Sequence, residues 1–357
     1  MQKPFEKAFS EMSFKERLLI VDSIRIIYPA FTDMLNLIED YHLYNKKTEP
    51  DCVFIGADTG AGKSTLKDEY SRRYPPTLTV KKGAHVNINK VLSSSIPPKA
   101  TILGTAGNLL RDLGDPGYNR GSIDTKTARL HKALEISEVE LIILDELNHL
   151  YDRDSQKLLK LVADWLKTLT VETNIPIIAL GLPTATSVFN PEVNAQLSRR
   201  FMRRVSLKPL LWDLEDNNSI VKFLCAVEES LPLMKPSNLF AEDMALRFFY
   251  ATDGSIAHVM TLIRQGTRKA LRNHQEFLDM SVFATVFDEL IRNDKPHKQI
   301  NPFQESFVKV EQEFIEELKR AQDKNSEQIE SEEPGNRATN NRIKAGKQKV
   351  LGISDVL

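Results

Sequence analysis

The chain has 357 residues and a net charge of −1, with 41% hydrophobic and 27% charged residues. This composition is typical of a globular protein, and the near-neutral charge excludes a general electrostatic attraction to nucleic acids or acidic membranes. The two cysteines, Cys52 and Cys225, have no neighbours at metal-ligand spacing, and no apolar run reaches 18 residues. We therefore expect a cytoplasmic protein without a zinc site, a disulfide framework or a membrane-spanning helix.

Residues 1–48 are expected to form an N-terminal helical segment. Ser13 and Glu16 have the S-x-x-E spacing of a capping box, and apolar residues then recur at helical intervals. Pro29 follows Tyr28, and a proline at this point breaks or kinks the helix. A second helix is expected over residues 31–44, before a polar hinge.

Residues 49–211 alternate between apolar runs and helical patterns. Continuous apolar runs separated by helices predict a parallel sheet that is buried on both faces, so the fold class is α/β. The predicted strands span residues 52–56, 85–92, 140–145, 176–181 and 203–208, and helices are expected at 63–73, 101–113 and 154–170.

Residues 212–296 contain four helical patterns and no convincing strand, which predicts a small all-α lid domain. A charged amphipathic helix is expected over residues 303–320 of the remaining segment, 297–357. The sequence that follows is polar and cannot bury enough apolar surface to offset the entropy of ordering, so a disordered tail is expected. Its apolar end, "VLGISDVL", is either a docking peptide or has no role.

The stretch "ADTGAGKST" has the form G-x-x-x-x-G-K-[ST], with Ala57 at the first glycine position. Such a loop points successive backbone N–H groups at the phosphates of a nucleoside triphosphate. A chance glycine-rich turn is disfavoured, because a strand precedes the loop and a helix follows it. We expect Lys63 to reach the β- and γ-phosphates and Ser64 to bind Mg²⁺. The full set of expected nucleotide-binding loop residues is Ala57, Thr59, Gly60, Ala61, Gly62, Lys63, Ser64 and Thr65.

The stretch "LIILDEL" supplies the expected acidic half of the site. Asp145 ends an apolar strand and is expected to hold Mg²⁺ directly or through water, while Glu146 is expected to orient or deprotonate the attacking water. Many strands end in acids by chance, but the spacing from the phosphate loop favours the functional interpretation. A polar residue often senses the γ-phosphate after the next strand. Leu182 and Pro183 stand there, with Thr184 as the nearest hydroxyl.

An arginine cluster and one histidine are further candidates. Arg199, Arg200, Arg203 and Arg204 form either a solvated basic turn or an arginine finger that reaches the nucleotide of a neighbouring subunit. The second interpretation implies an oligomer. His258 opens a helix after a glycine and either is structural or contacts the nucleotide in a pH-sensitive way.

From about Glu16 to about Asn293 the chain resembles the AAA+ transposition regulators of the TniB/TnsC family, which belong to Tn7-like transposons, including CRISPR-associated ones. The matching stretches include "KERLLIVDSIRIIYPAF", "IGADTGAGKST", "LIILDELNHL" and "AQLSRRF". The more specific ones are "IPPKATILGTAGNLLRDLGDP" and the "GSIDTKTARLHKAL" that follows. The resemblance implies an AAA+ core, a P-loop NTPase fold with ATP and Mg²⁺ as cofactors, which hydrolyses ATP to ADP and phosphate.

The resemblance also implies partners. Such proteins assemble head to tail into rings or filaments on double-stranded DNA, and hydrolysis disassembles them. They link target-site choice to a DDE transposase, here one similar to TnsB or TniA, through a target selector similar to TniQ. The expected partner of the C-terminal tail itself is a transposase or an endonuclease subunit. The implied arginine finger is Arg200, with Arg199 as second choice, and the implied DNA-backbone contacts are Lys99, Arg120 and Ser122.

Two positions depart from the family pattern. The family often has threonine where Leu182 stands and arginine where His258 stands, so nucleotide sensing is expected to be weaker here, although the acidic residues are intact. Two other functions share the same core. A clamp loader or helicase loader normally has a clean sensor arginine, and a DNA-independent signalling ATPase usually carries a repeat sensor and an effector domain.

The residues themselves give modest support for DNA binding. Six basic residues lie between the second and third predicted strands, although each is equally typical of a solvated surface. Phosphate contacts repeated in every subunit of a filament would give salt-dependent binding with little sequence specificity. The six are Lys90, Lys99, Arg111, Arg120, Lys126 and Arg129.

Overall fold

The computed structural model describes residues 9–44, 50–81, 83–98, 100–151, 156–212, 218–292 and 300–331. The chain forms two compact units, one of residues 29–207 and one that joins residues 1–28 to residues 208–357. The N-terminal segment, expected to be one piece to residue 48, is therefore divided at Tyr28. Its first helix belongs with the C-terminal helices, and its second belongs with the sheet.

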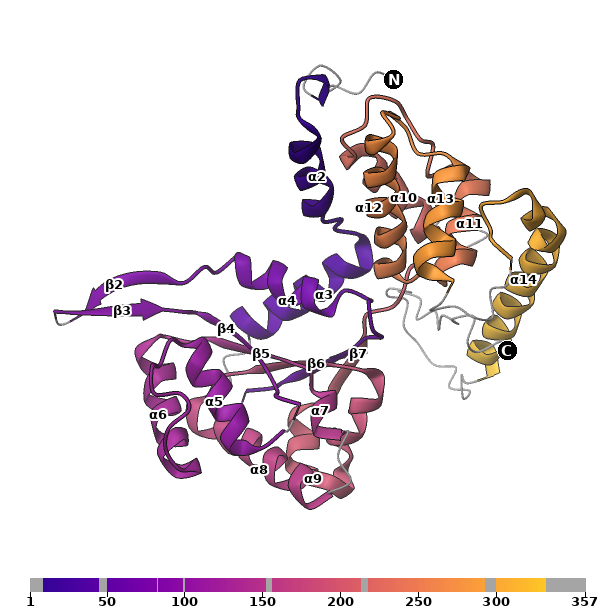
Figure 1. Cartoon of the computed structure of the whole chain (residues 1–357). Coiled ribbons are helices and arrows are strands. Elements are labelled where there is room, and N and C mark those ends of the chain that lie inside the picture. Colours follow the sequence, from indigo (N-terminus) through magenta and orange to yellow (C-terminus); the bar gives the residue numbers. More distant parts are fainter. Residues whose placement is uncertain are drawn as a thin grey trace. The chain divides into compact units, whose positions relative to one another are not determined.

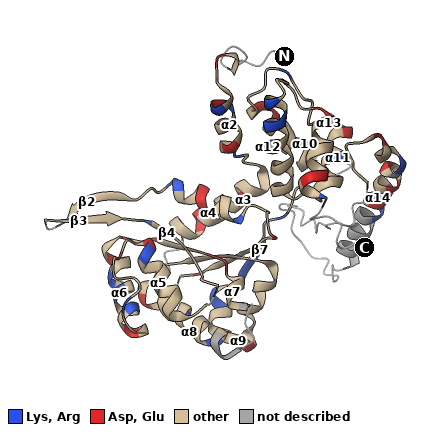
Figure 2. Ribbon diagram, viewed as in Figure 1, with Lys and Arg blue, Asp and Glu red and all other residues tan. Residues whose placement is uncertain are grey.

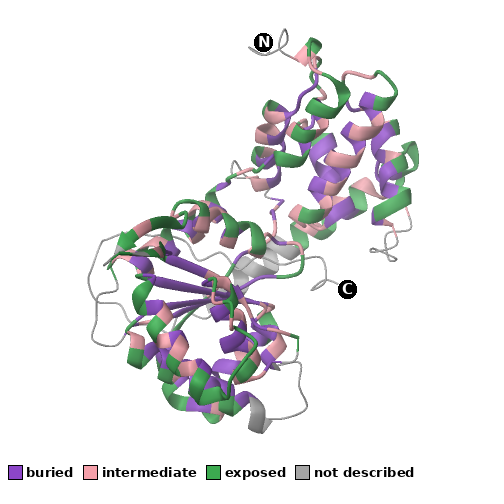
Figure 3. Ribbon diagram, turned by 60° about the vertical axis from the view of Figure 1, so that its left-hand side comes forward, coloured by how far each residue is buried: buried purple, intermediate pink, exposed green. Residues whose placement is uncertain are grey.

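The unit of residues 29–207 is built on a parallel sheet with the strand order β4-β5-β6-β1-β7. This confirms the predicted α/β class. The central strands are fully buried because each is a short apolar run with helices on both faces (Figure 3). The strands are β1 (Val53–Gly56), β4 (Val91–Ser95), β5 (Leu141–Asp145), β6 (Ile177–Gly181) and β7 (Arg203–Ser206).

Two layers of helices cover this sheet (Figure 1). One layer holds α3 and α4, and the other holds α5 to α9, whose apolar sides meet the sheet in one core. The helices are α3 (Pro29–Glu39), α4 (Lys63–Arg72), α5 (Ile102–Asp112), α6 (Ile123–Ile136), α7 (Asn148–Tyr151), α8 (Gln156–Thr173) and α9 (Pro191–Arg200). Shorter turns are η1 (Asp40–Tyr44) and η2 (Pro183–Phe189).

A separate antiparallel hairpin, β2 (Thr77–Lys81) with β3 (Ala84–Ile88), precedes β4 (Figure 1). The predicted strand at 85–92 was wrong, because it merged β3 with the start of β4. The hairpin follows from strict alternation in "TLTV" and "HVNI" around Gly83, whose φ of +78° suits a tight turn. Leu78 and Val80 of this hairpin are 72% and 62% exposed.

The second unit is all helical. Its core is aromatic: the ring of Phe248 lies 4.9 Å from that of Phe283 and 5.4 Å from that of Phe303, edge to face. The elements are α2 (Phe14–Ser23), α10 (Ser219–Ser230), α11 (Glu242–Thr252), α12 (Ile256–Arg272), α13 (Met280–Val286), η3 (Phe287–Ile291), η4 (Glu305–Phe307) and α14 (Val308–Ser331). None of the described helices is long and apolar enough to span a membrane.

Helix α14 is longer than the expected helix at 303–320. Residues 322–331, expected to begin the disordered tail, continue the helix to Ser331. Charged side chains at helical spacing support a helix even where few apolar residues are available to bury. The rest of the expected tail, including "VLGISDVL", lies outside the described residues.

The buried side chain of Arg17 connects helix α2 to the rest of the helical unit. Ser13 and Glu16 form the predicted capping box at its start. The Arg17 guanidinium pairs with the Glu276 carboxylate, and its Nε donates to the carbonyl oxygen of Pro232 at 2.9 Å. Hydrogen bonding to Arg17 is the main reason that the pKa of Glu276 lies below its ordinary value.

Candidate nucleotide-binding site

The carboxyl ends of β1, β5 and β6 meet at one edge of the sheet, where the register pairs Gly56 with Gly181. The predicted phosphate loop connects β1 to α4 at this edge. Gly62 caps α4 with a φ of +100°, a left-handed conformation that strains any other residue, and no side chain caps the helix. The first N–H groups of α4 are therefore available to an anion.

Side chains of the loop differ in exposure. Ala57 and Ala61 are buried, while Thr59, Ser64 and Thr65 are exposed. The ammonium of Lys63 turns back and donates to the carbonyl oxygens of Ala57 and Asp58, the latter at 3.0 Å. In this conformation the Lys63 ammonium is hydrogen-bonded to the loop itself. The expected contact with phosphate oxygens would replace these hydrogen bonds.

The pKa of Lys63 lies below its ordinary value because partial burial disfavours the charged ammonium. The charges of Asp145, Glu146 and Asp58 act in the opposite direction. The Lys63 ammonium therefore lies within electrostatic reach of both acids at the end of β5.

Asp145 is buried at the end of β5, and both of its carboxylate oxygens accept hydrogen bonds. Oδ1 accepts from the backbone N–H of Glu146 at 2.8 Å, and Oδ2 accepts from Nζ of Lys67 at 2.9 Å. The described residues contain no group of three or more His, Cys, Asp or Glu that could hold a metal alone. The Ser64 hydroxyl and the Asp145 carboxylate are oxygen donors of the kind that Mg²⁺ prefers, so these two residues would hold it.

Glu146 directly follows β5 in a left-handed conformation, with a φ of +61° that is unusual for this residue type. Its side chain is 44% exposed, and Oε2 accepts from Nδ2 of Asn148 at 3.1 Å. Nε2 of His149 lies 3.9 Å from the same oxygen, while Nδ1 of His149 lies 2.9 Å from the carbonyl oxygen of Ile96. The Glu146 carboxylate is thus held by a hydrogen bond from Asn148, while its side chain stays partly exposed.

The sensor position after β6 carries no polar side chain at Leu182 or Pro183, and Thr184 is exposed in η2. A Cβ atom on Gly181 would lie 3.1 Å from Cβ of Leu147, so a larger residue here would require Leu147 to shift. The expectation of weaker nucleotide sensing, with a sensor that is weak, displaced or missing here, stays a prediction.

Of the four clustered arginines, one is buried and three are exposed, although Arg204 also makes several hydrogen bonds. Arg200 is 9% exposed, and its guanidinium donates to the carbonyl oxygen of Pro50 at 3.4 Å. Arg204 donates to the carbonyl oxygens of Phe201 and Phe189 and to Ser198. Arg199 and Arg203 are exposed. Within one subunit, Arg199 is therefore better presented to a neighbour than Arg200, the first choice from the sequence.

Most of the six basic residues considered for DNA are already engaged. Lys90 pairs with Glu140 and Arg111 with Asp112, each at 2.9 Å, and Arg129 pairs with Asp115. Lys126 is 5% exposed, and Lys99 lies outside the described residues. Arg120 remains exposed, next to Ser122, whose Oγ accepts from the backbone N–H of Thr125 and caps α6. Figure 2 shows the basic residues carried by this region.

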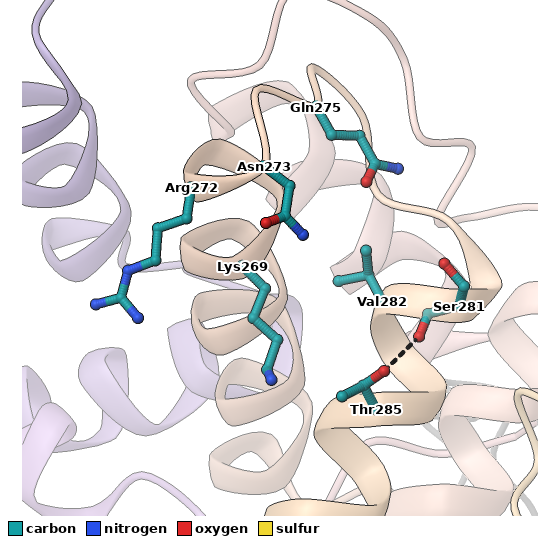
Figure 4. Close-up of a pocket in the computed structure, with 7 residues that line it drawn as sticks. All are labelled: Lys269, Arg272, Asn273, Gln275, Ser281, Val282 and Thr285. Atoms are coloured by element: carbon teal, nitrogen blue, oxygen red, sulfur yellow. Dashed lines mark hydrogen bonds between the residues drawn. The ribbon is translucent and has the colours of Figure 1, made fainter.

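His258 lies in the first turn of α12, in the helical unit, so any contact with the phosphate loop depends on how the two units are arranged in the working protein. A surface pocket of about 270 Å³ lies between α12 and α13 of the same unit (Figure 4). Its Lys269 is already neutralised by Glu289 at 2.8 Å, and it contains none of the predicted site residues.

Sequence reasoning missed Lys67, Asn148 and His149. Lys67 follows Lys63 by one helical turn, and "NH" follows Glu146 directly, so both signals were present in the sequence. Their roles depend on contacts with the end of β5, which spacing alone does not fix.

Solved structures share this fold at low sequence identity. The ORC1 protein of Aeropyrum pernix, solved in complex with DNA, has a TM-score of 0.54 and 17% identity, covering 78% of this chain and 70% of its own. Cdc6p of Pyrobaculum aerophilum has a TM-score of 0.54 and 14% identity, covering 76% of this chain and 71% of its own. The ORC2 protein of Aeropyrum pernix, solved in ADPNP–ADP complexes, has a TM-score of 0.50 and 14% identity, covering 76% of this chain and 70% of its own.

Structural similarity at such low sequence identity shows the fold alone. The fold is that of an AAA+ protein, which confirms the predicted fold class. A search of curated proteins gave no match. The family described as "Bacterial TniB protein" matches residues 17–209, which is more than half of the chain and includes the phosphate loop, both acids and the arginine cluster. The chain therefore belongs to the TniB family, as the sequence resemblance predicted.

Proposed function

We propose that this protein is an ATP-dependent regulator of DNA transposition that assembles on double-stranded DNA and links target-site selection to transposase recruitment. The observation that carries the proposal is the site at the edge of the sheet. There, Lys63 and Ser64 begin α4 beside Asp145 and Glu146, in a chain of the TniB family.

Each residue has a distinct task in ATP hydrolysis. The free N–H groups at the start of α4 and the Lys63 ammonium bind the phosphates, which requires Lys63 to leave the loop carbonyls. Ser64 and Asp145 hold Mg²⁺, which when bound neutralises charge on the phosphate oxygens. Glu146 accepts a proton from the attacking water, and Asn148 keeps its carboxylate in place.

Arg199 supplies positive charge to the γ-phosphate of a neighbouring subunit. Its exposure at the end of α9 supports this role, whereas Arg200 holds the start of β1 through Pro50. A site completed in trans makes hydrolysis depend on assembly.

DNA is bound through its backbone. Arg120 is exposed beside the start of α6, a helix of 14 residues whose N-terminal dipole favours phosphate. Lys99 and Ser122 are the other proposed contacts. A few phosphate contacts per subunit are weak alone, but they add up along an assembly and give little sequence preference.

The proposed partners follow from the family. They are a DDE transposase similar to TnsB or TniA, a target selector similar to TniQ, and an endonuclease subunit bound by the C-terminal segment. ATP hydrolysis would release the assembly once recruitment is complete.

The test is co-sedimentation of the full chain with a long duplex of random sequence. Binding should need ATP rather than ADP, fall steeply between low and moderate salt, and be independent of sequence. Arg120→Ala should weaken binding, whereas Arg111→Ala, whose guanidinium already pairs with Asp112, should not. Binding that ignores nucleotide and salt would contradict the proposal.

A further inference from the structure

Lys67 forms the contact in the site that the proposed mechanism does not use. It lies on α4, one turn after Lys63, and its ammonium lies 2.9 Å from Oδ2 of Asp145. The Lys67 side chain is 20% exposed and that of Asp145 only 4%, so this ion pair is largely shielded from water. A cation therefore already contacts the carboxylate proposed to hold the metal.

The other oxygen of Asp145 is also occupied, because Oδ1 accepts from the N–H of Glu146 at 2.8 Å. Each carboxylate oxygen thus has one protein donor, and the Lys67 ammonium balances the negative charge. Two cations close to the same oxygen repel each other strongly in a partly buried site. A metal that approaches Oδ2 must displace the Lys67 ammonium or bind against its charge.

We propose that Lys67 is a positioning residue that serves as the counter-ion of Asp145 and thereby sets how strongly nucleotide binding depends on Mg²⁺. The inference rests on the proposed nucleotide site. With Lys67 in place, the negative charge of Asp145 does not repel a triphosphate in the absence of metal. The same ammonium weakens the hold on the metal, so the protein binds nucleotide with a small metal requirement.

If Lys67 only connected α4 to β5 structurally, the expected effect of its removal would be different. Removing a structural contact lowers stability but leaves the metal dependence of binding unchanged. The chain offers a matched control at the opposite end of β5, where Lys90 pairs with Glu140, also at 2.9 Å but exposed to solvent. Loss of that pair removes the same charge without touching the metal-binding carboxylate.

The experiment measures the Kd of a fluorescent ATP analogue for the full chain, in EDTA and in Mg²⁺. We divide the Kd in EDTA by the Kd in Mg²⁺. In Lys67→Met this ratio should rise by about tenfold, as expected when a unit charge is lost beside a partly buried triphosphate. The Mg²⁺ concentration that gives half of the increase in nucleotide affinity should fall. Lys90→Met should match the wild type, and Lys67→Arg should retain most of the wild-type behaviour.

Lys67→Gln keeps a hydrogen-bond donor near Asp145 and so provides a second neutral variant if Lys67→Met folds poorly; it should raise the ratio in the same direction. An unchanged ratio in a folded neutral variant would overturn the inference, while the nucleotide site itself would stand. A wild-type chain that binds no nucleotide in either buffer would instead contradict the proposed function.

Discussion

Glu146 is the residue on which the proposed hydrolysis depends. It stands in a left-handed conformation at the end of β5 and is held by Asn148. Glu146→Gln should keep nucleotide binding but slow phosphate release by roughly 100-fold or more, because the amide cannot accept the proton from water. Glu140→Gln, at the other end of the same strand, is the control and should release phosphate normally. Unchanged turnover in Glu146→Gln would refute its assignment as the base.

Arg199 and Arg200 are neighbours in sequence but have opposite environments. Arg199→Ala should leave the stability of the monomer nearly unchanged and lower the ATPase rate only where subunits assemble, because the side chain is exposed. Arg200→Ala should lower the stability, since its buried guanidinium contacts the Pro50 carbonyl beside β1. The roles of the two arginines are separated by measuring the ATPase rate as a function of protein concentration and the stability by urea unfolding. Equal effects of both variants would remove the distinction.

At the residue scale, the motif predicted the local backbone correctly, because that geometry depends on consecutive residues. Gly62 and Lys63 follow a strand and open a helix, and their geometry is dictated by a few consecutive residues. Lys67 and His149 were not predictable in the same way. Their partners, Asp145 and Ile96, are far away in sequence and meet them only through the fold.

Two ion pairs join helix α2 to the helical unit, and that of Arg17 is the more shielded from water. Arg17→Ala should destabilise the helical unit by about 3 kcal/mol, because it leaves the Glu276 carboxylate without its partner. Arg268→Ala removes the exposed pair with Asp22 and should cost less than about 1 kcal/mol. Hydrogen exchange along α2 measures both. Similar protection in the two variants would show that Arg17 is not the anchor.

The same pair gives α2 a dependence on pH. The pKa of Glu276 is lowered from its ordinary value of 4.5, so its contribution to stability is present above that value. It is lost as the pH falls through the lowered pKa of the folded state. In Glu276→Gln this acid-induced part of the loss should be absent, which unfolding curves between pH 6 and about pH 3 would reveal. An identical pH profile in the variant would contradict this account.

Elements with a long apolar run or a clear helical repeat of apolar residues were predictable. A short hairpin, which depends on the pairing of two strands, was not. The apolar runs of β1, β5 and β6 and the amphipathic patterns of α5 and α8 led to the correct fold class. The β2–β3 hairpin was missed because its alternation is short and polar. The end of α14 was missed because charged residues sustain a helix without a long apolar stripe.

At the scale of the whole molecule, the chain passes between its two units twice, after Tyr28 and after Leu207. The N–H of Leu207 donates to the carbonyl oxygen of Gly56 at 2.9 Å, directly before the phosphate loop. The second crossing therefore starts next to the predicted phosphate loop. The division of the N-terminal segment was not predictable, because Arg17 finds Glu276 at a separation of 259 residues.

The central claim is that ATP bound at this site controls the assembly of subunits on double-stranded DNA. Electron microscopy of the full chain with long duplex DNA, Mg²⁺ and a slowly hydrolysed ATP analogue tests it most directly. The account predicts regular rings or filaments on the DNA, which disappear with ADP and in Lys63→Ala. Subunits that stay monomeric under these conditions at low salt, or Lys63→Ala assemblies identical to the wild type, would contradict it.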